Sequence, residues 1–135
     1  MNIVIDTNIF ISALIKDSIT RDLIVNSEDN LIFPEFELEE IEKHKQEILE
    51  KSGLSETEFE SLLSQLLEYV TIIKTEEINN YREQALEIIG QIDENDIIFI
   101  ATALAFDALI WSDDKHFKMQ DKIKTLTTED MIYYD

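Results

Sequence analysis

The chain has 135 residues, of which 44% are hydrophobic, two are glycine, one is proline and none is cysteine. This composition is too apolar for a disordered chain and excludes disulfides and thiolate metal sites, so we expect a single compact domain over residues 1–135 in a reducing cytoplasm. Thirty acidic against eleven basic residues give a net charge of −19, which argues against a tight, non-specific binder of nucleic acid.

The first half of the chain predicts two strands and four helices, the last two forming an αα-hairpin. Pro34 stops the second strand and suits the first turn of a helix, and residues 55–58 have the form of a capping box. We expect Thr7 or Asn8 near the first N-cap and Thr20 at the second. The predicted elements are a strand at 2–6, helices to 15 and from 20 to 27, a strand at 31–33, a helix at 35–51 stopped by Gly53, and a helix from the capping box through 67.

The second half continues the alternation of strands and helices. Asp93 is a good N-cap for an apolar, central helix, and Thr128 is the expected cap of a short terminal helix. The predicted elements are a strand at 70–73, a helix at 77–89 ended by Gly90, a helix at 94–106, a strand at 109–111 ending in a packed Trp111, a loop at 112–114 and a strand at 122–126. This order predicts an α/β fold, a three-layer α/β/α sandwich around a central parallel sheet.

Two features bear on the location of the protein. The longest apolar stretch, residues 97–106, is too short to cross a bilayer. The first apolar run starts at Ile3 and is interrupted at Asp6, which is not the pattern of a signal peptide. We expect a cytoplasmic protein with no membrane partner.

Acidic residues occur where ligands bind in this class of fold, at the carboxyl ends of parallel strands. Asp6 ends the first strand, and Asp114 follows the strand at 109–111. Asp93 and Asp96 are three residues apart at the start of a helix and therefore share a face. Glu40, on the helix after the second strand, is a further candidate.

A cluster of carboxylates predicts a bound cation, because like charges a few ångströms apart repel each other. Oxygen ligands without cysteine or paired histidines select Mg²⁺ or Mn²⁺. Such ions orient a phosphodiester and activate water, so the predicted chemistry is phosphoryl transfer to water.

Four motifs in order carry a resemblance to a known family. They are the strand end Asp6-Thr7-Asn8, the helical Glu40-Ile41 after Pro34, the Asp96 helix with Ala101-Thr102-Ala103-Leu104, and the loop Ser112-Asp113-Asp114-Lys115-His116-Phe117. Over nearly its whole length the chain resembles the PIN domain (PilT N-terminus) family, the fold of many metal-dependent ribonucleases. The resemblance implies a sheet of order 3-2-1-4-5.

The resemblance also implies a set of site residues. Asp6, Glu40, Asp96 and Asp114 would be the catalytic metal ligands and Asp93 an additional one, with Thr7, Asn8 and Ser112 in support. The motifs leave open whether Glu39 or Glu40 is the ligand, and likewise whether Asp113 or Asp114 is. Read locally, each acid has a structural alternative: a helix cap for Asp6 and Asp93, solvated surface for Glu40, and a turn for Asp114.

The implied activity is a divalent-metal-dependent endoribonuclease that cuts single-stranded RNA to leave a 5′-phosphate and a 3′-hydroxyl. Many family members are toxins, so the candidate partners are the RNA substrate, a small antitoxin protein and a second copy of the chain. Seven of the eleven positive charges fall in two segments, and four lysines that closely follow proposed ligands are candidates for phosphate contacts: Lys43, Lys45, Lys115 and Lys118. His44 and His116 are either exposed histidines or within reach of a phosphate or of water on the metal.

Two other functions stay open at this level. The net charge of −19 suits an inactive PIN scaffold that binds a protein partner. A phosphatase of the haloacid dehalogenase type also places Asp after its first strand, but it needs a second Asp where this chain has Asn8.

Overall fold

The protein is described by a computed structural model over residues 1–15, 19–90 and 93–134. In these residues the sheet has five parallel strands in the order β3-β2-β1-β4-β5, as predicted. The strands are β1 (Asn2–Ile5), β2 (Asn30–Pro34), β3 (Thr71–Ile73), β4 (Leu109–Trp111) and β5 (Thr125–Leu126). Ile3, Val4 and Ile5 are each fully buried, because helices cover both faces of the central strand.

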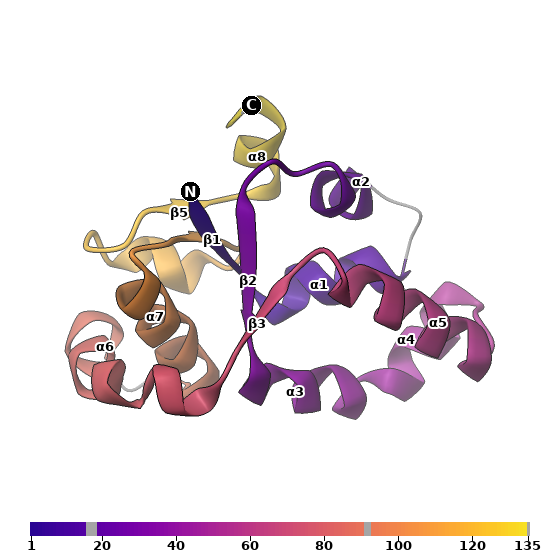
Figure 1. Cartoon of the computed structure of the whole chain (residues 1–135), viewed down its shortest axis with the longest axis horizontal. Coiled ribbons are helices and arrows are strands. Elements are labelled where there is room, and N and C mark those ends of the chain that lie inside the picture. The colour runs from indigo at the N-terminus through magenta and orange to yellow at the C-terminus, as the bar shows by residue number, and fades with distance from the viewer. Residues whose placement is uncertain (16–18, 91–92, 135) are drawn as a thin grey trace.

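Helices cover the sheet from both sides, which confirms the predicted three-layer α/β/α sandwich. Figure 1 shows α6 (Arg82–Ile89) and α7 (Glu94–Phe106) on one side of the sheet. On the other side lie α1 (Thr7–Ile15), α2 (Ile19–Val25), α4 (Lys45–Ser52) and α5 (Glu56–Leu67). The helix α7 is buried over most of its length because it contacts β1, β2 and β4 at once. None of the helices in the described ranges is long and apolar enough to cross a membrane.

The single helix predicted over 35–51 is wrong. The chain forms a 3-10 turn at Glu35–Glu37, then α3 (Leu38–Lys43), and starts again as α4 after His44. The backbone N–H of His44 donates to the carbonyls of both Glu40 and Ile41 at 3.2 Å, a shared bond that is typical of a helix end. Local charge and periodicity continue across His44, so the sequence pattern does not show this break.

Two other elements are shorter than predicted. The segment 77–89 is helical only in α6, which follows 3-10 turns at Thr75–Glu77 and Asn79–Tyr81, because the fully buried Ile78 holds the chain against the core between these turns. The predicted strand at 122–126 is reduced to β5, since the Gln120 side chain bonds the backbone N–H groups of Lys122 (2.9 Å) and Ile123 (2.8 Å) and holds them in a loop. Gly90 ends α6 with φ 78°, as expected.

The structure corrects two of the predicted helix caps and confirms another. The predicted cap Thr20 is wrong, because α2 already includes Ile19 and Thr20 is buried within the helix. Thr127 rather than Thr128 caps α8 (Thr128–Tyr134): its hydroxyl accepts from the Asp130 N–H at 3.0 Å, and Asp130 accepts from the Thr127 N–H at 2.9 Å. The capping box at Ser55 and Glu58 is confirmed, and Gly53 ends α4 at φ 72°.

Candidate active site

A pocket of about 210 Å³ lies where β1, β2 and β4 end. Ile5 pairs with Trp111, and the Asp6 N–H donates to the Trp111 carbonyl at 3.0 Å, so the chain leaves β1 and β4 side by side. The strand order reverses at this pair, which is where open parallel sheets bind ligands. The pocket is lined by Asp6, Thr7, Asn8, Glu37, Glu40, His44, Asp93, Asn95, Asp96, Phe99 and Asp114.

Asp6 is the carboxylate at the end of the central strand, and it is only 5% exposed. The Ser112 hydroxyl donates to its Oδ2 at 2.6 Å, and the Asn8 N–H lies 3.4 Å from its Oδ1. Burial raises the pKa of Asp6 and the nearby Asp114 carboxylate adds to this, while the Ser112 hydrogen bond acts in the opposite direction. Since Ser112 also accepts from the Asp114 N–H at 2.9 Å, this buried serine ties two predicted ligands together.

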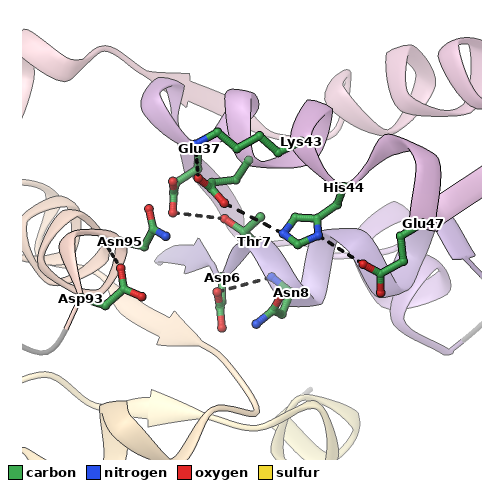
Figure 2. Close-up of polar contacts among 10 residues, drawn as sticks. Asp6, Thr7, Asn8, Glu37, Lys43, His44, Glu47, Asp93 and Asn95 are labelled. Atoms are coloured by element: carbon green, nitrogen blue, oxygen red, sulfur yellow. Dashed lines mark hydrogen bonds and ion pairs between the residues drawn. The ribbon is translucent and has the colours of Figure 1, made fainter.

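Glu37 is the site residue that the sequence analysis missed. Its side chain is fully buried in the pocket, where the Thr7 hydroxyl donates to Oε1 at 3.4 Å (Figure 2). With the Asn95 amide turned so that its nitrogen faces Glu37, that nitrogen donates to both carboxylate oxygens at 3.1 and 2.9 Å. Burial, followed by the negative charge of Glu40, raises the pKa of Glu37 to about 7. Thr7 is the first residue of α1, next to the N-cap as expected, and its hydroxyl positions Glu37.

A signal for Glu37 was present in the sequence. In the helix predicted over 35–51, Glu37 is four residues before Ile41 and would therefore be a charged residue on the apolar stripe. The pair Glu37-Leu38 also fits the motif of a glutamate followed by an aliphatic residue after Pro34.

The predicted ligand Glu40 also reaches the pocket, but it lies nearer the solvent. Its side chain is 21% exposed and accepts from Lys43 Nζ at 3.0 Å, and His44 Nε2 lies 4.0 Å away. The neighbouring Glu39 is exposed and does not line the pocket.

Asp96 lies in the first turn of α7 and is 7% exposed. Burial, followed by the charge of Asp93, raises its pKa to about 6. Its Oδ2 accepts no hydrogen bond from any residue that the structure describes. The predicted cap Asp93 is confirmed, because Asp93 caps α7 by accepting from the Asn95 N–H at 2.9 Å. Asp93 also lines the pocket, where its role as a metal ligand stays a prediction.

The two aspartates of the 112–114 loop make different contacts. Asp114 lines the pocket and caps the 3-10 turn at Lys115–Met119 by accepting from the His116 N–H at 2.9 Å. Asp113 instead accepts from the N–H and the hydroxyl of Thr128, both at 2.8 Å, and so holds the start of α8.

The four lysines predicted to contact phosphate differ in their position relative to the pocket. Lys43 pairs with Glu40 at the pocket, and Lys115 is exposed directly after Asp114. Lys45 is directed away from the pocket to α5, where it pairs with Glu56 at 2.7 Å and Glu60 at 3.0 Å. Lys118 lies 3.8 Å from Asp130. Of the four, Lys43 and Lys115 are the best placed for a phosphate.

The donor set of the pocket fits a divalent cation. Asp96 contributes a buried carboxylate oxygen that accepts no hydrogen bond within residues 1–15, 19–90 and 93–134, and Asp6 and Glu37 are buried beside further acids. Carboxylates are gathered in this way at cation sites, because the ion offsets their mutual repulsion.

The fold is a parallel α/β sheet, and its acidic pocket lies where the strand order reverses. Together these features define a class of α/β proteins with a candidate metal site. Within that class the PIN domain family model matches residues 4–134, so the chain belongs to the PIN domain family.

Two solved structures support the same fold. VapBC2 from Rickettsia felis, in a crystal structure bound to a DNA fragment from the VapBC2 promoter, gives a TM-score of 0.69 at 20% identity over 94% of this chain and 98% of that chain. VapBC-1 from nontypeable Haemophilus influenzae gives a TM-score of 0.66 at 19% identity over 96% of this chain and 99% of that chain. A search of the curated proteins found no match.

Proposed function

We propose that the protein is a divalent-metal-dependent endoribonuclease that hydrolyses phosphodiester bonds of single-stranded RNA. The observation that carries the proposal is the burial of Asp6, Glu37 and Asp96 around one pocket, in which Asp96 Oδ2 has no hydrogen-bond donor in the part of the chain that the structure describes. Membership of the PIN domain family supports the nuclease class and speaks against the haloacid dehalogenase alternative.

Each residue of the pocket has a distinct part in this proposal. Mg²⁺ or Mn²⁺ would be held by Asp6, Asp96, Asp114 and Glu37, with Glu40 and Asp93 at the rim. When bound, such an ion lowers the pKa of a water and stabilises the charge that develops on the phosphoryl oxygens.

The surrounding residues position these ligands and the substrate. Ser112 fixes the carboxylate of Asp6, and Thr7 and Asn95 fix that of Glu37. Asn8 is exposed and lines the pocket, so its amide could contact a bound RNA. Lys43, which pairs with Glu40, and the exposed Lys115 would contact phosphates of the bound RNA.

The biological setting that we propose is a cytoplasmic toxin–antitoxin pair. The two similar structures are VapBC proteins, and this supports a second, inhibitory protein that covers the acidic pocket.

The proposal is tested by incubating the purified protein with end-labelled single-stranded RNA in Mn²⁺ or Mg²⁺. We expect cleavage that EDTA stops and that an excess of the ion restores. Asp6→Asn should reduce the rate by about 100-fold or more, because it weakens a ligand and disturbs the bond from Ser112.

Asp107→Asn is the matched control, since it makes the same chemical change at an exposed residue beyond the far end of α7. Asp107 has φ 49°, a conformation that asparagine tolerates. Cleavage by Asp6→Asn at the rate of Asp107→Asn, or by the wild type in EDTA, would contradict the proposal.

The inactive scaffold is the alternative function, and the net charge of −19 is the observation that favours it. It predicts that Mn²⁺ does not bind at the pocket. Calorimetry separates the two: Mn²⁺ binding that Asp96→Asn abolishes supports the nuclease, and the absence of heat with the wild type supports the scaffold.

A further inference from the structure

His116 faces two of the acids in the pocket, and the proposed function does not yet use it. Its Nδ1 lies 3.5 Å from Asp96 Oδ2 and 3.5 Å from Asp114 Oδ1. One ligand atom from each of these three residues lies within 4.8 Å of the other two. An ion with bonds of about 2.1 Å separates adjacent ligand atoms by about 3 Å and opposite ones by about 4 Å, so these spacings suit a shared cation.

The second observation concerns Asp96 Oδ2, the buried oxygen that accepts no hydrogen bond among the described residues. The carboxylate to which it belongs is only 7% exposed, and the atom near it is the ring nitrogen of His116. A buried carboxylate oxygen without a donor has a free-energy cost that a cation at this point would remove.

The position of His116 is fixed by its neighbours in the chain. Its backbone N–H donates to Asp114 Oδ1 at 2.9 Å, which closes the turn that begins at Asp114. The next residue, Phe117, is 1% exposed and packs edge-on against Phe99 with ring centroids 6.1 Å apart. Phe99 is three residues after Asp96 on α7, so this aromatic contact holds the His116 turn against the helix that carries Asp96.

We propose that His116 Nδ1 is a nitrogen ligand of the metal, together with Asp96 and Asp114. This rests on the proposed function and deepens it, because it assigns the kind of ion. Mg²⁺ takes oxygen ligands, whereas an imidazole favours first-row transition metals. The pocket therefore selects a transition-metal dication such as Mn²⁺ over Mg²⁺.

Pulsed electron paramagnetic resonance with Mn²⁺ as the only added ion tests this directly, because a coordinated imidazole gives a ¹⁴N coupling. The chain has two histidines, so each can be removed in turn. We expect the coupling in the wild type and in His44→Ala, and its loss in His116→Ala. His116 has an exposed side chain (47%), so its replacement should leave the fold intact.

Calorimetry gives an independent measure of selectivity. The Kd of Mn²⁺ should rise by about 10- to 100-fold in His116→Ala. The Kd of Mg²⁺ should rise by a smaller factor, so that the preference for Mn²⁺ falls.

Two results would overturn the inference and leave the nuclease standing: bound Mn²⁺ without nitrogen coupling in the wild type, or coupling that only His44→Ala removes. An equal loss of Mn²⁺ and Mg²⁺ affinity in His116→Ala would also overturn it. Failure of Mn²⁺ to bind at all would overturn this inference and the proposed function together.

Discussion

Glu37→Gln should lower the rate of RNA cleavage by about 100-fold or more, although the family resemblance pointed to Glu40 as the ligand. Glu37 is fully buried and receives hydrogen bonds from Thr7 and Asn95, which fix its carboxylate in the pocket. Glutamine keeps the size of the side chain but loses the negative charge that a cation requires. The loss should be larger than that of Glu40→Gln, whose carboxylate is partly exposed and already paired with Lys43.

Glu39→Gln is the control for this prediction, because it makes the same change of charge at an exposed position two residues further along the chain, in the first turn of α3. Its cleavage rate should stay within about twofold of the wild type. The rates are measured on one RNA at saturating Mn²⁺. If Glu40→Gln were inactive and Glu37→Gln fully active, Glu40 would be the ligand and Glu37 a structural acid.

Glu37→Gln should also change how stability depends on pH. The pKa of Glu37 is raised from 4.5 to about 7, so between these values the folded state retains a proton that the unfolded state has released. The free energy of unfolding therefore decreases as pH rises through this window, and the penalty is complete above about pH 7. In metal-free buffer the glutamine variant should be more stable than the wild type by up to about 3 kcal/mol at pH 8, and little different at pH 5.

Urea denaturation in EDTA at the two pH values measures this difference, and Glu39→Gln controls for the change in net charge. Saturating Mn²⁺ at pH 8 should stabilise the wild type more than Glu37→Gln, because the ion replaces the proton. An equal stability difference at pH 5 and pH 8 would show that ionisation of Glu37 does not destabilise the folded state.

The sequence predicts most of the sheet because its signals there are local. Short β-branched runs, Pro34 after a strand and Gly90 after a helix each act within a few residues, and each of the five strands lies within or overlaps a predicted one, although β5 is reduced to Thr125–Leu126. The strand order is not local information, and it came from the family resemblance. The acids Asp6, Asp96 and Asp114 were located by the same combination of strand ends and motifs.

The features that the sequence did not predict depend on contacts between distant segments. Glu37 could be recognised as a pocket residue only through its burial beside Thr7 and Asn95, which come from two other elements. The role of Asp113 likewise depends on Thr128, fifteen residues away in the chain. In a helix rich in glutamate, charge alone does not separate the buried side chain from the exposed ones.

Part of the positive charge that suggested an RNA surface is paired within the protein. Lys45 pairs with Glu56, Lys51 lies 2.7 Å from Glu47, and Lys118 lies near Asp130. An acidic chain with part of its positive charge paired internally should make few phosphate contacts, so recognition of RNA would depend mainly on the metal pocket.

The most direct test of the acidic pocket as a metal site is an anomalous difference map from a crystal soaked with Mn²⁺. We predict a peak in the pocket, in contact with the carboxylates of Asp6, Glu37, Asp96 or Asp114. Peaks found only at exposed surface acids, with none between the ends of β1 and β4, would contradict the assignment of this pocket as the metal centre of a nuclease.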